Sequence, residues 1–248
     1  QPYVGEPRQS CLYEEHLKLT AARNMITFAG WTMPVWYTSI GEEHRAVREA
    51  AGLFDVSHMG VLEVRGEHAT RFLDLVTTSY VPSLRPGQAQ YAFLLDPNGS
   101  VIDDILIYCL APDRYMLVVN AANAEKDKAW LDAVNAREVL LDRQYPQKAV
   151  DVAVEIRDLK APSSGADRRV DLSLQGPHSL AILQKVVDDE AASRALARLR
   201  RSEFLQASVA GTAALISRTG YTGEAYGFEL YVHPDRAPAV WNLLLREG

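Results

Sequence analysis

Residues 88–108, QAQYAFLLDPNGSVIDDILIY, decide how the middle of this chain folds. Two runs of bulky apolar residues flank a turn at 96–99, because Pro presets the turn and Asn-Gly accepts positive φ. A second turn, at 111–113, leads into another strand pattern. The sequence therefore predicts an antiparallel meander of three strands, at 88–95, 100–110 and 114–120.

Two adjacent carboxylates, Asp103 and Asp104, lie in the middle of the second predicted strand. Neighbouring side chains of a strand point to opposite faces, so both cannot reach water if the strand is central. A buried carboxylate without a partner takes up a proton or costs several kcal/mol. The pattern leaves two interpretations open. One is a structural pair with Arg or backbone N–H groups, and the other is a carboxylate directed into a cavity at a cationic or N–H-bearing ligand.

Helices and strands alternate irregularly outside the meander, which is typical of an α+β fold. Residues 143–169 read as irregular, and the chain ends within a helical pattern without having begun with Met, which leaves open that it is a piece of a longer protein. Helical spacing covers 12–22, 39–51, 67–77, 122–136 and 177–187, and strand patterns cover 60–66, 170–176, 212–217 and 228–232.

Composition narrows the class of protein. The 248 residues are 48% hydrophobic and 23% charged, which are ordinary globular values. The net charge of -6 argues against a nucleic-acid partner or an anionic-membrane surface. No apolar run approaches the roughly 18 residues of a membrane helix, and the first residues lack a signal-peptide layout. We expect a cytoplasmic protein without a metal site, since no His or Cys spacing is typical of one.

Two further stretches invite a functional interpretation. In RTGYTGE, at 218–224, two glycines flank Tyr221, which suits either close approach of the backbone to a ligand or a plain tight turn. In LFDVSHMG, at 53–60, His58 fits a structural partner of a nearby acid better than a catalyst. No motif of a hydrolytic nucleophile is present.

Six ordered motifs carry a resemblance to a known family. FAGWTMPVWY, AAGLFDVSHMG, NGSVIDDILIY, LVVNAANAEKD, LQGP and ISRTGYTGE resemble the aminomethyltransferases of the glycine cleavage system, the T-proteins, from about residue 12 to the end. The resemblance implies two interleaved α+β lobes with antiparallel, ferredoxin-like sheets and a third, β-barrel domain. We expect the first lobe at 1–55 and 150–248 and the second at 56–149, with the chain ending before the β-barrel.

The resemblance also implies a site. The family's essential carboxylate falls on Asp104, as the catalytic residue that faces folate, with Asp103 as a structural neighbour. Ser100 departs from the family pattern, where a second Gly is usual, and GEAYGFE is one residue longer than the family's GEDGFE, which puts the last assignment most in doubt. The pterin-binding positions implied are Met59, Tyr91, Asp104, Asn120, Tyr221 and Glu229.

The implied reaction moves a one-carbon unit from an aminomethyl group on a lipoylated carrier protein, the H-protein, to the cofactor tetrahydrofolate, with release of ammonia. The alternatives are a folate-dependent demethylase, the folate module of a dimethylglycine or sarcosine dehydrogenase, and a truncated homologue that binds folate without catalysis. A folate-binding iron–sulfur assembly factor is disfavoured, since such proteins carry a Cys beside the position of Tyr221.

Overall fold

The computed structural model describes residues 5–248, which form two compact units. Of the described residues, unit 1 comprises 5–58 and 168–248, and unit 2 comprises 59–167, so unit 2 is inserted into the sequence of unit 1. Residues 150–167, expected in the first lobe, belong to unit 2, because strand β9 (Glu155–Asp158) pairs with β5 (Gly60–Arg65). An α+β architecture is thus present in each unit.

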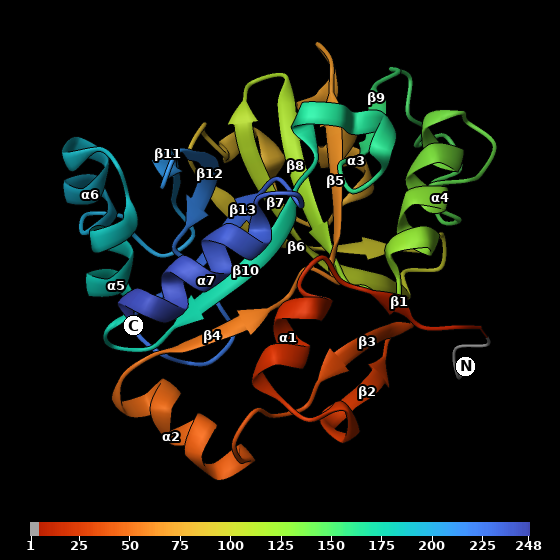
Figure 1. Ribbon diagram of the computed structural model, residues 1–248. Coiled ribbons are helices and arrows are strands. Elements are labelled where there is room, and N and C mark those ends of the chain that lie inside the picture. Colours follow the sequence, from red (N-terminus) through yellow and green to blue (C-terminus); the bar gives the residue numbers. More distant parts are fainter. Residues whose placement is uncertain (1–4) are drawn as a thin grey trace. The chain divides into compact units, whose positions relative to one another are not determined.

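Unit 2 is built on a five-stranded antiparallel sheet in which the predicted meander supplies three neighbouring strands (Figure 1). Oδ1 of Asp96 holds the first turn, because it accepts hydrogen bonds from the backbone N–H groups of Asn98 at 2.8 Å and Ser100 at 2.9 Å. The meander predicted from the sequence is confirmed. The spatial order is β6-β7-β8-β5-β9, with β6 at Ala89–Leu95, β7 at Val101–Ala111 and β8 at Arg114–Val119.

Helices α3 (Ala69–Val76) and α4 (Ala124–Asn135) cover one face of this sheet. Every second residue of β7 faces them, because strand side chains alternate between the two faces. Ile105 and Ile107 therefore lie in a core with Leu131 of α4, and all three are at most 2% exposed. The opposite face of β7 carries the even-numbered residues. Short 3₁₀ turns at Val81–Ser83 and Pro162–Asp167 complete the unit.

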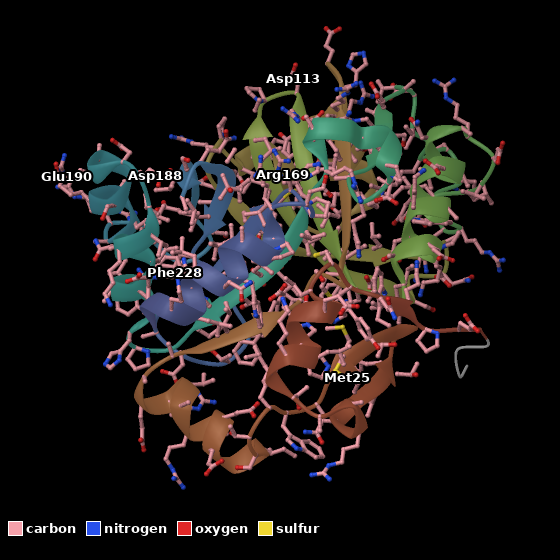
Figure 2. The ribbon with its side chains drawn as sticks, viewed as in Figure 1. Met25, Asp113, Arg169, Asp188, Glu190 and Phe228 are labelled. Carbon is pink, nitrogen blue, oxygen red and sulfur yellow. The ribbon has the colours of Figure 1, made fainter. Side chains whose placement is uncertain are left out.

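Unit 1 is built on a second five-stranded antiparallel sheet, in the order β11-β12-β13-β10-β4. Its core joins alternate residues of these strands, such as Leu172 and Phe228, to Trp241 and Leu183 of the helices, and Figure 2 labels Phe228. The strands are β4 (Gly52–Asp55), β10 (Val170–Gln175), β11 (Phe204–Val209), β12 (Thr212–Ser217) and β13 (Gly227–Val232), and the helices are α5 (Ser179–Val186), α6 (Glu190–Leu196) and α7 (Ala237–Glu247).

The N-terminal part of unit 1 carries a small three-stranded sheet and two helices. Ser39 begins the second helix as an N-cap, because its side chain accepts from the backbone N–H of Glu42 at 3.3 Å while its hydroxyl donates to that carboxylate at 2.8 Å. The elements are β1 (Arg8–Gln9), β2 (Met25–Phe28), β3 (Trp31–Pro34), α1 (Tyr13–Leu19), α2 (Ile40–Glu49) and a 3₁₀ turn at Ala22–Asn24.

Several elements have no counterpart in the sequence-based expectations, among them β1, β3 and β4. The others include β9, within the stretch expected to be irregular, and the neighbouring α6 and β11 of unit 1. Among residues 5–248, none of the helices has the length and apolar character that crossing a membrane requires.

Candidate functional site

The two adjacent aspartates of β7 lie in different surroundings. Asp103 is 3% exposed and shares the helix-covered face with Ile105 and Ile107, whereas Asp104 is half-buried on the opposite face. The sequence alone does not distinguish the surroundings of the two carboxylates. They differ because α4 covers the face of the sheet that carries Asp103. Asp103 therefore has the surroundings of a structural carboxylate, whereas Asp104 does not.

Asp103 is held by amide groups at the end of β8 and the start of α4. It accepts hydrogen bonds from Asn120 through the backbone N–H at 3.0 Å and Nδ2 at 2.9 Å, and from Nδ2 of Asn123 at 2.5 Å. Burial works against its charge, but hydrogen bonds from Asp127, Asn120 and Asn123 outweigh it and hold the pKa of Asp103 below its ordinary value. This carboxylate stays charged without a cationic partner.

Asp104 has a different set of contacts. Its Oδ1 accepts from Nδ2 of Asn120 at 3.1 Å, and its backbone carbonyl accepts from the same nitrogen at 3.1 Å. Within residues 5–248 no Arg, Lys or His forms an ion pair with it. Glu63 shows the alternative, because this fully buried carboxylate contacts Arg114 Nε and Arg157 Nη2, both at 2.5 Å. Asp104 thus has acceptor capacity that Glu63 lacks.

Two aromatic rings lie on the same face as Asp104. Phe93 is its direct partner across the β6–β7 ladder, and Tyr91 is two pairs further along, opposite Leu106, and therefore on the same face. The Tyr91 and Phe93 rings meet edge to face, with centroids 5.2 Å apart, and Tyr91 remains 46% exposed. Desolvation, followed by hydrogen bonding to Asp104, raises the pKa of Tyr91. An exposed aromatic ring therefore lies beside a carboxylate acceptor.

The structure brings four of the predicted site residues to one edge of the unit 2 sheet. Asp104, Tyr91 and Asn120 are linked by the contacts above, and Met59 directly precedes Gly60, which pairs with Val119 at the end of β8. Met59 is half-buried, and its carbonyl accepts from Nζ of Lys160 at 3.0 Å. A ligand with N–H groups and a flat ring suits this edge.

The other two predicted residues, Tyr221 and Glu229, belong to unit 1. Tyr221 is 73% exposed in the loop that precedes β13, and Glu229 is 7% exposed within that strand. The hydroxyl of Thr219 donates a short hydrogen bond to Glu229. Burial, followed by the charge of Glu229, raises the pKa of the neighbouring Asp171 well above its ordinary value. The polar face of the unit 1 sheet thus holds a second pair of buried carboxyl groups.

The glycines of the Tyr221 loop have a structural explanation inside unit 1. A Cβ added at Gly220 or Gly227 would lie 2.1 or 1.9 Å from Oε1 of Gln175, far inside contact distance. The side chain of Gln175 donates to the carbonyl of Thr219 at 3.1 Å and accepts from the hydroxyl of Thr222 at 3.1 Å. These two glycines let the loop close around Gln175.

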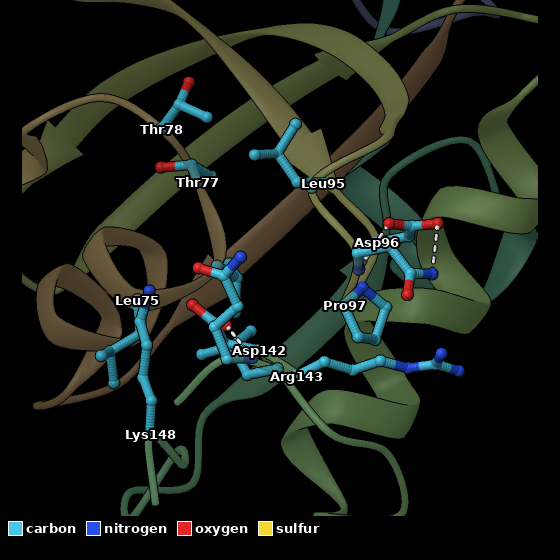
Figure 3. A pocket seen from close by; sticks show the side chains of 14 residues that line it. Leu75, Thr77, Thr78, Leu95, Asp96, Pro97, Asp142, Arg143 and Lys148 are labelled. Carbon is cyan, nitrogen blue, oxygen red and sulfur yellow. Dashed lines mark hydrogen bonds between the residues drawn. The ribbon is translucent and has the colours of Figure 1, made fainter. Parts of the chain in front are cut away.

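A cavity of about 460 Å³ lies elsewhere in unit 2, between the end of α3, the β6–β7 turn and the loop that follows α4. Figure 3 shows Asp96 and Pro97 on one side of it and Leu75 and Lys148 on the other. None of the predicted site residues lines this cavity. It is therefore separate from the edge that carries Asp104. Among residues 5–248 there is no group of three His, Cys, Asp or Glu side chains that could hold a metal ion.

Sequence reasoning missed two residues of this cluster, Asn123 and Asp127. A signal was present in the spacing of α4, because Asp127, Leu131 and Val134 follow the i, i+4, i+7 pattern of an apolar face and all three are buried. An acid at an apolar position of a helix has to find a polar partner, and Asp103 is that partner here.

Comparison with known proteins assigns the family. A model described as the GCVT N-terminal domain matches residues 12–248. The chain belongs to the GCVT N-terminal domain family. It is 43% identical over 243 residues to the aminomethyltransferase of Symbiobacterium thermophilum, covering 97% of this chain and 58% of that relative. It is 42% identical over 241 residues to the aminomethyltransferase of Thermus thermophilus, covering 97% of this chain and 61% of that one.

Solved structures support the same GCVT N-terminal domain fold. The glycine cleavage system aminomethyltransferase T of Bartonella henselae matches with a TM-score of 0.76 at 32% identity, over 96% of this chain and 57% of that one. A heterotetrameric sarcosine oxidase from Corynebacterium sp. U-96 shares the fold, with a TM-score of 0.55 at 16% identity. The predicted α+β class and family resemblance are thus confirmed, and the chain spans about 58% of the length of the aminomethyltransferase of Symbiobacterium thermophilum.

Proposed function

We propose that this protein is a tetrahydrofolate-dependent aminomethyltransferase of glycine cleavage. It would take a one-carbon unit from an aminomethyl-lipoyl carrier protein, the H-protein, and pass it to tetrahydrofolate with release of ammonia. Membership of the GCVT N-terminal domain family supports this, as do relatives named aminomethyltransferase at 42% and 43% identity. Because the chain covers 58% and 61% of those relatives, the activity of the whole protein belongs to the proposal.

The observation that carries the proposal is the free acceptor capacity of Asp104. Its carboxylate accepts from Asn120 Nδ2 at 3.1 Å and forms a hydrogen bond with Tyr91, and no cation neutralises it within the described residues. The reduced pterin of tetrahydrofolate is a flat ring with several N–H groups, which suits a carboxylate acceptor beside the exposed ring of Tyr91. The donor and acceptor chemistry of this edge therefore fits the cofactor.

In this reaction tetrahydrofolate supplies the nitrogen that accepts the one-carbon unit. Asp104 would accept a ring N–H and so fix the orientation of the acceptor nitrogen. As an anion, it would also stabilise the positive charge that develops on the transferred carbon. Tyr91 would pack against the ring, and Asn120 would hold Asp104 in place through Nδ2. We further assign Met59, Tyr221 and Glu229 to folate binding.

Replacement of Asp104 by Asn tests the proposal. The Asp104→Asn variant should keep its fold and much of its tetrahydrofolate affinity by calorimetry, while turnover with lipoylated carrier protein falls by about 10²- to 10⁴-fold. Asp113→Asn is the matched control, because Asp113 is exposed in the β7–β8 turn, where Figure 2 labels it. This control should retain normal turnover and affinity.

Normal turnover by the Asp104→Asn variant would show that the catalytic assignment is wrong. Identification of the folate product separates the proposed reaction from its alternatives. Methylenetetrahydrofolate is expected, whereas methyltetrahydrofolate would indicate a demethylase. Binding of tetrahydrofolate without any turnover would indicate a homologue that binds folate without catalysis.

A further inference from the structure

Asp127 is a buried acid that the proposed reaction does not use. It is 0% exposed on α4, on the stripe that also carries Leu131 and Val134. Within residues 5–248 neither of its oxygens receives a hydrogen bond from an amide, a hydroxyl or a cationic group. A charged carboxylate in such a place is unfavourable, so the group needs either a proton or a partner.

The group that interacts with Asp127 is the carboxyl of Asp103 on β7, through a side-chain hydrogen bond between the two acids. Two carboxyl groups form a hydrogen bond only when one of them carries a proton. Asp103 already accepts from the backbone N–H of Asn120 and from the side-chain amides of Asn120 and Asn123, at 2.5 to 3.0 Å, and these bonds favour its charged form. The proton therefore belongs to Asp127, which donates to Asp103.

Electrostatics agree with this geometry. Burial, then the hydrogen bond to Asp103 and the charge of Asp103, raise the pKa of Asp127 to about 8. The one cation that acts on the group is Lys126 of the same helix, and it opposes the shift. The ammonium of Lys126 is already occupied, because it donates to the carbonyl of Ile102 at 2.8 Å and to Oδ1 of Asn123 at 3.0 Å.

Lys126 also explains which way the amide of Asn123 points. Because Oδ1 accepts from Lys126, Nδ2 is the atom left to face Asp103. Asn123 stands at the N-cap of α4, yet its side chain makes no cap hydrogen bond to its own helix. The first turn of α4 thus directs Asn123 and Asp127 toward one carboxylate rather than toward the helix itself.

We propose that Asp127 is a positioning residue of the Asp104 site: as a neutral acid it donates a hydrogen bond to Asp103, which in turn holds Asn120 against Asp104. The links of this chain are continuous, since Nδ2 of Asn120 lies 2.9 Å from Oδ1 of Asp103 and 3.1 Å from Oδ1 of Asp104. The proposal rests on the proposed function in one respect, which is that Asp104 is the catalytic residue.

Two substitutions at one position separate this role from simple packing. Asp127→Asn keeps a neutral donor of similar size, so turnover should stay within about threefold of the original protein. Asp127→Leu fills the space but removes the donor, so kcat should fall by about 10- to 100-fold through misplacement of Asn120 and Asp104, with a much smaller change in KM. Equal loss in both variants would overturn the proposal.

A titration of the unsubstituted protein gives a readout that depends on neither folding of a variant nor turnover. The side-chain carboxyl carbon of Asp127, followed by ¹³C NMR, should titrate near pH 8, and Asp103 should titrate below the ordinary Asp range. Titration of Asp127 near pH 4 would overturn the proposal. The side-chain amide resonances of Asn120 should shift in Asp127→Leu and remain in place in Asp127→Asn.

These readouts also separate failure of this inference from failure of the proposed function. A protein without aminomethyl transfer could still show Asp127 titrating near pH 8 and Asn120 responding to Asp127→Leu, which would support the chain of contacts and refute the transferase assignment. Normal aminomethyl transfer, combined with Asn120 side-chain amide resonances that do not shift in Asp127→Leu, would support the transferase assignment and refute the inference.

Discussion

Each unit of the molecule contains a pair of buried carboxyl groups, and the two pairs differ in how they are supplied with donors. In unit 2, Asp103 accepts three amide N–H bonds and Asp127 accepts none. In unit 1, Glu229 accepts the hydroxyl of Thr219, whereas Oδ1 of Asp171 has no partner within residues 5–248. In each pair one carboxyl has a raised pKa, Asp127 in unit 2 and Asp171 in unit 1, and in each the proximity of the other carboxylate adds to the shift. Burial is the largest cause of both raised pKa values, and in unit 2 the hydrogen bonds that Asp103 accepts keep the pKa of that carboxyl low despite its own burial.

The geometry of the two pairs also differs. Asp103 and Asp127 come from a strand and from the helix that covers it, so their contact depends on how α4 packs. Asp171 and Glu229 come from adjacent strands of one ladder, where Asp171 is opposite Tyr231 and Ser173 is opposite Glu229. The ladder fixes the second pair through backbone hydrogen bonds. The first pair is fixed by side chains, and is the one that substitutions can shift.

The largest expected effect is at Asp103. Asp103→Asn places an amide group against the donors of Asn120 and Asn123, so part of their hydrogen bonding is lost and the free energy of unfolding should fall by about 3 kcal/mol. Asp127→Asn should change it by less than about 1 kcal/mol, because a neutral donor remains. Urea denaturation at pH 7 measures both. Equal destabilisation by the two variants would show that the proton has been assigned to the wrong acid.

A smaller effect is expected at the unit 1 pair. Thr219→Val removes the hydroxyl that donates to Glu229 and should lower the free energy of unfolding by about 1 to 2 kcal/mol. Thr219→Ser keeps the hydroxyl and serves as the control. Thermal and urea denaturation of the two variants give the comparison, and the same loss for Val and Ser would show that the hydroxyl has no part in holding Glu229.

The smallest effect on Tm at low pH is expected for Asp171→Asn. The same substitution should show the clearest dependence of Tm on pH. A folded-state pKa above the unfolded value of about 3.9 gives stability that is fully present below that pH and is lost as pH rises toward the folded pKa. Replacing the Asp171 carboxyl by an amide abolishes this loss of stability at higher pH. The Tm of the variant, relative to that of the original protein, should therefore rise between pH 5 and pH 8.

Asp188→Asn is the matched control in the same unit. Hydrogen bonds from the hydroxyl of Ser208 and then from the backbone of Gly211 lower the pKa of Asp188, so its contribution is present above the unfolded pKa and is lost only as pH falls. The change in Tm caused by Asp188→Asn should be the same at pH 5 and pH 8. A pH-independent Asp171→Asn would contradict the raised pKa of Asp171.

Much of the fold could be predicted because local chemistry specifies it. The turn at 96–99 is closed by its own Asp96 side chain, and the alternation along β6, β7 and β8 needs no distant information. Strand β9 could not be predicted in the same way. Its four residues contain one large apolar side chain, Ile156, and its partner β5 lies about 90 residues away, as the Arg65–Glu155 pair shows. A strand this short that pairs with a distant segment gives little signal in its own local sequence.

The candidate site was predictable only in part. The alternation of β7 indicates that Asp103 and Asp104 face opposite sides, but which side the helices cover is a tertiary property. The resemblance supplied Asp104, Tyr91 and Asn120, and the roles of these residues remain a proposal. Asp127 could have been found from the apolar stripe of α4, whereas its proton could not, because that depends on the donors that surround Asp103.

The contact of Gln175 with two glycines has a consequence for protein engineering. A larger residue at Gly220 or Gly227 would require the end of the Gln175 side chain to move, and Gly220 also has a φ of +154° that favours glycine, so changes at these three positions are coupled. The six residues between the glycines, at 221–226, are mostly exposed or half-buried and end at fixed points. Libraries randomised there should keep Thr222, Glu224 and Tyr226, which contact Gln175, Arg48 and Arg218 respectively, and vary the exposed positions between them.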